Sequence, residues 1–254
     1  MFCKLSADAK SKNRSRRKEY KITENDAFHT TEAFRHLKAS LSVALPKRKN
    51  EGGVVLMIAS ARPESGKTTV AANLALMFAM SNIKVLVIDA DIRKGRLARY
   101  FGVTSKPGLT DYLSGQASMD EIIRGVEDND HLSYITCGTR SLHPYELLES
   151  NEMKELLAQL KTKYDYILID TPPILVVSDA MALATQTDGV ILVCRHKISY
   201  VNDIKKAVSE LEFAKANLLG VVINDYKEKS RLSYKHQYKY GKYYDYAYEN
   251  DDEE

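Results

Sequence analysis

The sequence predicts a doubly wound α/β fold built on a mostly parallel sheet, and three observations support this prediction. Short runs rich in apolar and β-branched residues alternate with segments of helical period. Several of these runs are apolar throughout, as strands covered by helices on both faces are. Polar residues follow the ends of three runs, which is where sheets of this kind bind ligands. The chain has 254 residues, of which 44% are hydrophobic and 28% charged, enough for one sizeable domain.

The expected elements follow one another along the chain. The runs expected to form strands are residues 54–59, 85–89, 134–137, 166–170, 189–194 and 218–224. The segments expected to cover them as helices are residues 67–80, 146–160 and 200–213, because their apolar residues recur at helical spacing. A further helix, outside the sheet, is expected over about residues 26–45, where Phe34, Leu37, Leu41 and Leu45 share one helical face.

The two ends of the chain differ from its middle in charge and composition. Residues 1–21 carry eight basic and two acidic residues, whereas the last fourteen residues carry one basic and six acidic residues. Neither end has the aliphatic content needed to bury a core. We therefore expect a basic flexible segment at 1–25, a folded domain at 26–228 and an acidic tail at 229–254. The tail is rich in tyrosine: Tyr234, Tyr238, Tyr240, Tyr243, Tyr244, Tyr246 and Tyr248.

Composition also disfavours several classes of protein. No run reaches the roughly 18 to 20 consecutive apolar residues of a membrane span, and no apolar signal-peptide segment follows the basic N-terminus, so we expect a cytoplasmic protein. Cys3, Cys137 and Cys194 are odd in number and widely spaced, which argues against a disulfide framework or a zinc site. A net charge of +3 is too small to indicate nucleic acid binding.

The first expected strand leads into a loop with the composition of a phosphate-binding loop. Because a helix follows the loop at once, backbone N–H groups and the positive end of that helix would point at an anion. Lys67 would bridge the outer phosphates of ATP, and the Thr68 hydroxyl would ligate Mg²⁺. Ala61 stands where the motif GxxxxGK[ST] has its first glycine. The loop residues expected to bind ATP are Arg62, Pro63, Glu64, Ser65, Gly66, Lys67, Thr68 and Thr69.

Three carboxylates lie at or just beyond the ends of two further expected strands. Asp89 and Asp91 straddle one residue, so they share a side of the extended chain, where a pair can orient a nucleophile and hold Mg²⁺ through water. Asp170 ends the run 166–170, and a buried carboxylate at a strand end is costly unless a cation lies near it. The sequence therefore predicts a MgATP site between the loop and two Asp-bearing strand ends.

Together, these elements and their spacing resemble the bacterial protein-tyrosine kinases of capsule and exopolysaccharide export, often called BY-kinases. The similarity spans most of the chain and includes residues 108–113, residues 146–150 and the tyrosine-rich tail. It implies a P-loop NTPase of the deviant-Walker type, like the partition and division-site ATPases, with an added N-terminal helix. It also implies an ATP- and Mg²⁺-dependent kinase that phosphorylates tail tyrosines of a neighbouring subunit in a ring, which then comes apart.

The resemblance implies roles for individual residues. Lys67, Asp89 and Asp91 would be catalytic, with Asp89 accepting or orienting the phenolic proton of the acceptor tyrosine. Thr68, Asp91 and Asp170 would hold the metal directly or through water. The division of roles among the three aspartates stays open. Asn224 is similar to the adenine-side residue of the family, although an asparagine that caps the core is an alternative.

The resemblance also implies partners. Glu32, Arg35 and Lys38 are similar to the ExxRxxR oligomerisation motif of the family, with lysine in place of its last arginine. A separate membrane adaptor of the polysaccharide co-polymerase type and a cognate phosphotyrosine phosphatase would act with the chain, and other protein substrates would be possible. The chain would be the cytoplasmic catalytic subunit of a split, Firmicutes-like system, held at the inner face of the membrane. No nucleic acid partner is expected.

Two other functions share parts of this pattern. A partition or division-site type ATPase would hydrolyse ATP to switch its dimerisation, and it shares the fold and both loops. The sequence favours it less, because the chain has no amphipathic membrane helix at its C-terminus, no basic face typical of DNA binding, and many tail tyrosines. A regulatory subunit that only binds nucleotide would not need all of Lys67, Asp89, Asp91 and Asp170.

Overall fold

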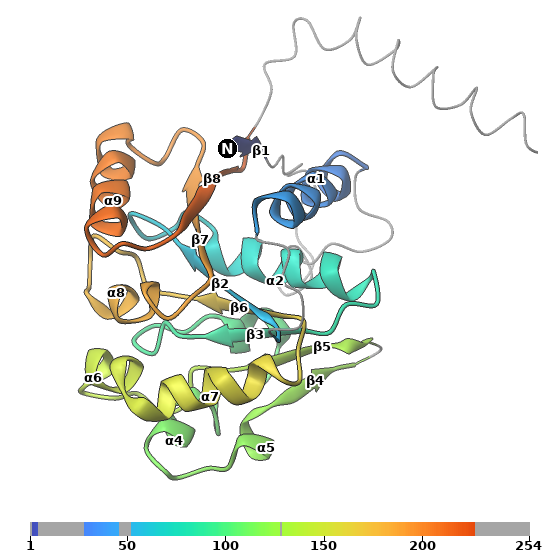
Figure 1. Ribbon diagram of the computed structural model, residues 1–254, viewed down its shortest axis with the longest axis vertical. Helices are drawn as coiled ribbons and strands as arrows, with labels where there is room; N and C mark the ends of the chain where they lie inside the picture. The colour runs from blue at the N-terminus through green and yellow to red at the C-terminus, as the bar shows by residue number, and fades with distance from the viewer. Residues whose placement is uncertain (1, 5–27, 46–51, 128, 227–254) are drawn as a thin grey trace, which may run out of the picture.

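The computed structural model describes residues 2–4, 28–45, 52–127 and 129–226. They form one eight-stranded sheet of order β1-β8-β7-β2-β6-β3-β5-β4 (Figure 1). Its strands are β1 (Phe2–Lys4), β2 (Val54–Ala59), β3 (Val85–Asp89), β4 (Arg124–Val126), β5 (Asn129–Ile135), β6 (Tyr166–Asp170), β7 (Gly189–Arg195) and β8 (Leu218–Asn224). All neighbouring strands pair in parallel except β4, which is antiparallel to β5.

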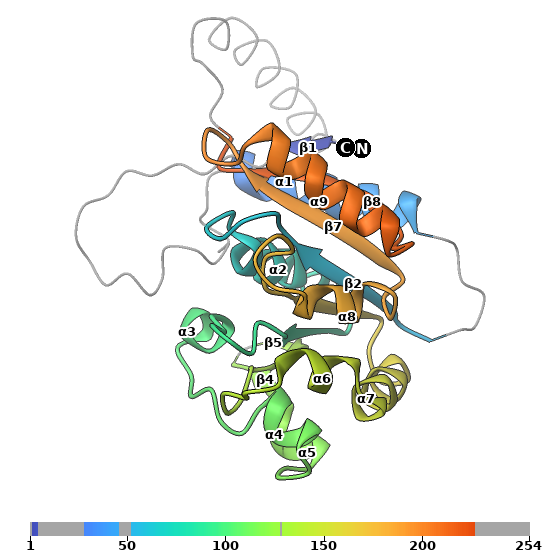
Figure 2. The same cartoon turned by 90° about the vertical axis from the view of Figure 1, so that its left-hand side faces the viewer.

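Helices cover both faces of this sheet, as Figures 1 and 2 show. The helices are α1 (Phe28–Ala44), α2 (Lys67–Ala79), α3 (Leu97–Phe101), α4 (Leu109–Leu113), α5 (Met119–Ile122), α6 (Pro144–Glu149), α7 (Asn151–Lys161), α8 (Asp179–Ala184) and α9 (Val201–Phe213). Helices α1, α2 and α3 contribute to the core on one face, and α4 to α9 contribute to the core on the other. Among the described helices, none combines the length and the apolar character that a membrane span requires.

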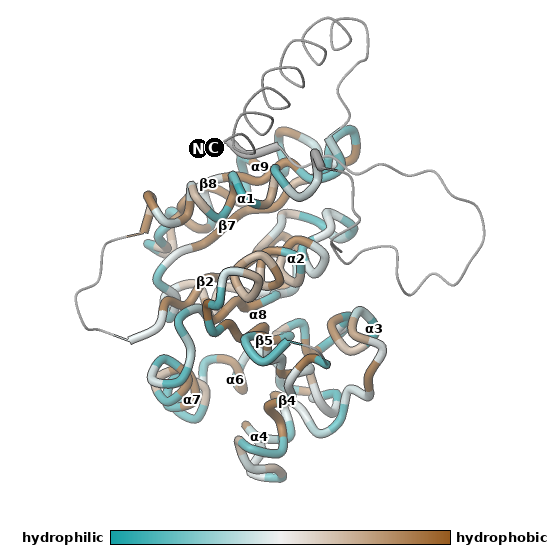
Figure 3. Tube along the Cα trace, turned by 90° about the vertical axis from the view of Figure 1, so that its right-hand side faces the viewer, coloured by the Kyte–Doolittle hydropathy of each residue, from teal (hydrophilic) through white to brown (hydrophobic). Residues whose placement is uncertain are grey.

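The middle of the sheet is apolar on both sides, which explains its continuous hydrophobic runs. In β2, Leu56 and Ile58 face one core, whereas Val55, Met57 and Ala59 face the other, and all five are fully buried. Figure 3 shows the hydrophobic colour concentrated along the central strands β2 and β7. Such strands need cover on both faces.

Most of the expected elements are present at the expected positions. Five of the six strand predictions match β2, β3, β6, β7 and β8 to within one residue. The strand expected at 134–137 begins earlier, at Asn129, because polar residues alternate with apolar ones near the sheet edge. The helix expected over 146–160 is two helices, since Ser150 is extended and its side chain accepts a hydrogen bond from the N–H of Met153, which starts α7.

Two edge strands were not predicted. Strand β1 lies in the segment 1–25 for which the sequence predicts flexibility, yet its backbone pairs with β8. Strand β4 has only three residues, too few to show a period. The remaining boundaries of the three expected parts of the chain stay predictions.

Helix α1 lies outside the sheet, as expected. Its apolar face is buried against α2 and the edge of the sheet, and that face consists of Phe34, Leu37, Leu41 and Leu45. Leu37 and Leu41 also line a small apolar cavity with Val221 of β8. The sequence pattern therefore identified the buried side of this helix correctly.

Strand register brings the polar strand ends to one level. Ile58 of β2 is the Cα partner of Asp170 of β6, and Asp170 is in turn the partner of Asp89 of β3. Because parallel strands end at the same edge of a sheet, the loops that follow β2, β3 and β6 surround one place.

Candidate active site

The loop between β2 and α2 is folded onto itself. The hydroxyl groups of Ser60 and Ser65 both donate to the carbonyl oxygen of Arg62, over 2.8 and 2.7 Å. Gly66 precedes α2 with a φ of 86°, in the left-handed region that favours glycine. A Cβ atom at Gly66 would lie 2.1 Å from Nδ2 of Asn224. The loop therefore has the glycine-dependent shape of a phosphate cradle at a helix N-terminus.

Lys67 and Thr68 begin α2 beside Asp170. Lys67 is almost completely buried, with 9% relative exposure, so its ammonium group is held within the site. The Thr68 hydroxyl donates a hydrogen bond to Oδ2 of Asp170. Oδ1 of Asp170 is buried and has no hydrogen-bond partner among the described residues. A buried carboxylate oxygen without a partner is costly, so this atom is suited to a cation.

Asp89 and Asp170 form a buried pair of carboxylates at the sheet edge. Burial raises the pKa of Asp89 well above its ordinary range, and the charge of Asp170 raises it further. Oδ2 of Asp89 accepts a hydrogen bond from the N–H of Leu97 at 2.9 Å, which opposes that rise. Burial likewise raises the pKa of Asp170, against the lowering effects of Lys67 and of the Thr68 hydroxyl. Asp91 is only partly buried and is therefore the most accessible of the three.

The residues at this edge fit a magnesium ion bound together with phosphates. Within the described part of the chain, no three His, Cys, Asp or Glu side chains are arranged to hold a metal by themselves. Mg²⁺ in phosphate sites needs only one or two carboxylates, because phosphate oxygens and water complete its shell. The free oxygen of Asp170 and the adjacent Thr68 hydroxyl meet that requirement.

Two arginines near the site are paired with aspartates that are distant in the sequence. Arg93, which follows β3, makes a bidentate ion pair with the fully buried Asp179 of α8, and its second contact measures 3.1 Å. Arg62 of the loop makes a bidentate pair with Asp203 of α9, at 3.1 and 3.2 Å. These hydrogen bonds raise the pKa of both arginines and lower that of Asp203.

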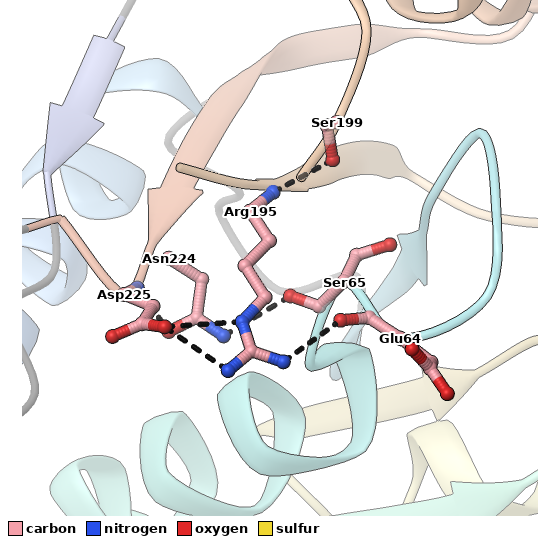
Figure 4. A network of polar contacts seen from close by, with 6 residues as sticks. All are labelled: Glu64, Ser65, Arg195, Ser199, Asn224 and Asp225. Carbon is pink, nitrogen blue, oxygen red and sulfur yellow. Dashed lines mark hydrogen bonds and ion pairs between the residues drawn. The ribbon is translucent and has the colours of Figure 1, made fainter. Parts of the chain in front are cut away.

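The end of β8 is tied to the phosphate-binding loop (Figure 4). Nδ2 of Asn224 donates to the carbonyl oxygen of Ser65 at 3.0 Å, and its Oδ1 accepts from the N–H of Asp225 at 2.9 Å. Arg195 pairs with Asp225 at 3.0 Å and also donates to the carbonyl oxygen of Glu64 at 3.4 Å. Asn224 thus supports the loop directly, whether or not it also contacts a base.

The loop after β3 passes close to Asp89. A Cβ atom at Gly95 would lie 2.7 Å from Oδ2 of Asp89 and 2.5 Å from Sγ of Cys137. Burial, followed by the charge of Asp89, raises the pKa of the Cys137 thiol to about 11. Gly95 is therefore needed for the close approach of this loop to the buried carboxylate.

Other residues proposed from the sequence lie away from this edge. On α1, Arg35 is exposed and forms an ion pair with Glu32, and Lys38 donates to the hydroxyl of Ser81. All seven tail tyrosines lie outside the described residues.

The structure thus brings together Lys67, Thr68, Asp89, Asp91 and Asp170, as expected. Sequence reasoning missed Asp179, Arg195, Asp203 and Asp225, because each pairs across a long stretch of chain and has no local motif. Asp179 and Asp203 lie in the first turns of their helices, where acidic residues are common for local reasons. Only the structure could identify them as partners of site residues.

Comparison with known proteins finds relatives over most of the chain. A family model described as an AAA domain matches residues 54–219. The tyrosine-protein kinase ptk of Acinetobacter johnsonii is 35% identical over 199 residues, which make up 78% of this chain and 27% of ptk. The tyrosine-protein kinase YwqD of Bacillus subtilis is 36% identical over 222 residues, 87% of this chain and 92% of YwqD.

Solved structures agree with these relatives. The kinase domain of the Escherichia coli tyrosine kinase ETK has a TM-score of 0.77 and 29% identity, and the match covers 90% of this chain and 92% of that one. The chimerical protein CapA2B2 has a TM-score of 0.75 and 30% identity, over 81% and 88% of the two chains. The septum site-determining protein MinD from Pyrococcus horikoshii, complexed with Mg-ADP, has a TM-score of 0.59 and 28% identity, over 70% and 73%.

The relatives differ in length. The chain spans only about a quarter of the length of ptk, but nearly all of YwqD. The match to YwqD and to the AAA domain model, together with the loop and the aspartates at one sheet edge, leads to one conclusion. The chain has a nucleotide-binding P-loop fold and belongs to the bacterial tyrosine-protein kinase family, the BY-kinases.

Proposed function

We propose that the chain is an ATP-dependent protein-tyrosine kinase that phosphorylates its own C-terminal tyrosine cluster in trans. The observation that carries this proposal is that Lys67, Thr68 and three aspartates of this chain converge at one sheet edge. The chain is also similar to a tyrosine-protein kinase over most of its length. By its resemblance to kinases of capsule and exopolysaccharide export, the chain would regulate the synthesis and export of such a polysaccharide.

The proposed reaction moves the γ-phosphoryl group of ATP to a tyrosine hydroxyl. A bond forms between the phenolic oxygen and phosphorus, the bond to ADP breaks, and the phenolic proton leaves. Free tyrosine has a pKa of about 10, so a nearby base is needed at neutral pH. Asp89 is our candidate to take or orient that proton, and the rise of its pKa on burial makes its carboxylate more basic.

Nucleotide and metal would be held by the residues already described. Residues 62–69 would bind the phosphates, with Lys67 at the outer ones, and Thr68, Asp91 and Asp170 would hold Mg²⁺ directly or through water. The metal would neutralise charge on the β- and γ-phosphates during transfer. MinD, a structural neighbour, is described in complex with Mg-ADP, which supports this cofactor pair. Arg62, now paired with Asp203, would have to leave that partner to reach a phosphate.

The proposed assembly has three parts. The unphosphorylated chain would form a ring through the α1 face that carries Glu32, Arg35 and Lys38. A membrane adaptor would activate it and keep it at the inner face of the membrane, and the CapA2B2 chimera, whose name joins two components, supports such a partner. A cognate phosphatase would reverse the modification. Acceptors outside the chain would be other proteins and not nucleic acid.

Peptide mapping by mass spectrometry after incubation with MgATP tests the proposal. The wild-type chain is expected to gain phosphate on tyrosines between residues 234 and 248, in the presence of a candidate adaptor fragment if not alone. Lys67→Met should abolish the modification, whereas Lys163→Met, an exposed lysine before β6, should not. A variant with all seven tail tyrosines changed to Phe should lose nearly all phosphotyrosine.

The same experiment separates the kinase from the hydrolytic alternative. The MinD neighbour shares the fold, so a hydrolytic switch would use the same loop and aspartates. Release of ADP that needs Lys67, with an unmodified tail under every condition, would favour that switch and overturn the kinase proposal. Phosphotyrosine that persists at the same level in the all-Phe variant would refute the choice of the tail as acceptor.

A further inference from the structure

The loop from β3 to α3 carries more positive charge than the site uses. Residues 92–102 contain four basic residues and no acidic residue. Arg93 is occupied by Asp179. Lys94, Arg96 and Arg99 are exposed, and none of them makes an ion pair with another described residue. We refer to these three residues as the cationic rim.

Backbone contacts hold the rim beside the aspartates. The N–H of Lys94 donates to Oδ1 of Asp91 at 3.0 Å, and the N–H of Leu97 donates to Oδ2 of Asp89 at 2.9 Å. Arg96 is the neighbour of Leu97 in the chain, and consecutive Cα atoms are about 3.8 Å apart. The backbones of Lys94 and Arg96 therefore lie next to the two carboxylates. Arg96 is close enough for its charge to act on Asp170, where it opposes the effect of burial.

The end of the C-terminal tail, in a copy of this chain, has the complementary charge. The last fourteen residues contain six acidic residues and one basic residue. The described chain ends at Tyr226, two residues after Asn224, and Asn224 is bonded to Ser65 of the phosphate-binding loop, so the last described residues lie close to the site. A chain of 26 residues can span up to about 85 Å when extended, which is ample to reach the rim of the same or a neighbouring molecule.

The tail tyrosines fall into two groups by the charge beside them. Those next to an acidic residue are Tyr244, Tyr246 and Tyr248, beside Asp245 or Glu249. Those next to a lysine are Tyr234, Tyr238, Tyr240 and Tyr243, beside Lys235, Lys239 or Lys242. The chain therefore contains its own comparison between acceptors that a cationic surface attracts and acceptors that it repels.

We propose that the cationic rim of Lys94, Arg96 and Arg99 selects acceptor tyrosines with acidic neighbours, so that Tyr244, Tyr246 and Tyr248 are phosphorylated first. This inference rests on the proposed kinase function and adds the determinant of acceptor choice. Each phosphate adds almost two negative charges. Tyr243, which is adjacent to Tyr244, therefore becomes a favourable acceptor only after Tyr244 is modified.

Initial rates at each tyrosine, measured by peptide mapping in the full-length chain, test the selection. In the wild type, the rates at Tyr244, Tyr246 and Tyr248 are expected to exceed those at Tyr234, Tyr238 and Tyr240 by about three- to tenfold, the size of a few exposed charge interactions. In Arg96→Gln combined with Lys94→Gln, this ratio should fall toward one. Lys163→Gln removes a charge just before β6, at the opposite end of that strand from Asp170, and should leave the ratio unchanged.

Charge exchange gives a second readout that a structural role would not produce. Asp245→Lys should slow Tyr244 and Tyr246, and Arg96→Glu in the same chain should restore them. If Arg96 acted on ATP instead, its loss would lower the rate at every tyrosine by the same factor, and the ratio would stay constant. That result, or equal rates at both groups in the wild type, would overturn the proposal.

A binding measurement keeps this inference separate from the kinase proposal. A labelled peptide of residues 241–254 is titrated with the full-length Lys67→Met chain. This measurement does not depend on catalysis. Binding should be weaker by about three- to tenfold when Lys94 and Arg96 are neutralised. If no tyrosine is modified but the rim binds this peptide, the kinase proposal fails while the docking surface stands. If binding ignores the rim, the docking surface fails.

Discussion

Around the site, single charged side chains are matched to partners far away in sequence. Arg62 and Asp203 are 141 residues apart, and Arg93 and Asp179 are 86 residues apart. Motifs located Lys67, Thr68 and the three aspartates, because phosphate and metal chemistry restricts both residue type and spacing. No such restriction exists for the supporting pairs, since any strand or helix end could supply the opposite charge. The sequence therefore predicted the groups that would touch the nucleotide but not those that hold them.

Substitution of Asn224 tests whether this residue supports the phosphate-binding loop or recognises the base of the nucleotide. Loss of its hydrogen bond to the carbonyl oxygen of Ser65 should cost about 1 kcal/mol, because one intramolecular hydrogen bond is removed. Asn224→Ala is therefore expected to weaken binding of ATP and GTP about equally, by roughly fivefold. Titration with fluorescent analogues of both nucleotides measures this. Asn217→Ala, whose side chain donates to the carbonyl oxygen of Asp188 before β7, serves as the control. A loss confined to ATP would instead assign Asn224 to the base.

Cys137 should be unreactive at neutral pH although it lies beside the site. Burial and Asp89 raise the pKa of its thiol to about 11, and only the thiolate reacts with alkylating agents. Alkylation is expected to be a few hundredfold slower than for a free cysteine at pH 7, and to accelerate about tenfold per pH unit up to pH 10. Peptide mapping after timed iodoacetamide treatment distinguishes Cys137 from the other cysteines. Labelling as fast as that of glutathione at pH 7 would contradict the expectation.

At the scale of elements, pattern length decided what the sequence could reveal. Strands β2, β3, β6, β7 and β8 are buried on both faces or bounded clearly, and helices α2 and α9 have 13 residues each, enough to show a period. Helices α3, α4, α5 and α8 have four to six residues and were not predicted. They are held by tertiary contacts, such as the bond from Leu97 to Asp89 at the start of α3. Short elements of this kind shape the site and carry little local signal.

The turn into α4 depends on a glycine for steric reasons. A Cβ atom at Gly108 would lie 2.4 Å from the carbonyl oxygen of Thr136 and 2.5 Å from the backbone nitrogen of Gly138. Gly108→Ala is therefore expected to lower the free energy of unfolding by about 1–3 kcal/mol, as overpacking against backbone does. Gly125→Ala in β4, where a Cβ atom would meet open space, should change it by less than about 0.5 kcal/mol. Urea unfolding of both variants measures the difference, and equal stabilities would show that α4 can shift freely.

For the molecule as a whole, the fold separates α1, the helix proposed for self-association, from the aspartates of the candidate active site. Helix α1 packs its apolar face on α2 and turns Arg35 outward, whereas the aspartates lie at the ends of β3 and β6. A neighbouring copy could therefore engage α1 without covering the site. The sequence predicted this helix and its buried face, but the extent of self-association is a property of two molecules and stays a prediction.

Self-association should depend on Arg35 while the stability of the monomer does not. The pair between Glu32 and Arg35 is exposed and three residues apart, so it should contribute less than about 0.5 kcal/mol to the fold. Arg35→Glu is expected to leave the melting temperature unchanged and to convert the unphosphorylated assembly to monomers. Sedimentation velocity measures the assembly, with Lys154→Glu on the exposed side of α7 as control. Assembly of Arg35→Glu at wild-type concentrations would remove α1 from the interface.

Strand β1 gives the last strand of the sheet a second neighbour. Phe2, Cys3 and Lys4 stand opposite Val221, Val222 and Ile223, while β8 also pairs with β7. Along a strand, successive N–H groups point to opposite sides, so alternate amides of β8 are bonded to β7 and to β1. In an amide exchange experiment, deuterium should thus enter the middle of β8 in an alternating pattern. The slow amides would be those that face β7, and the fast ones would report how often three residues at the start of the chain leave the sheet.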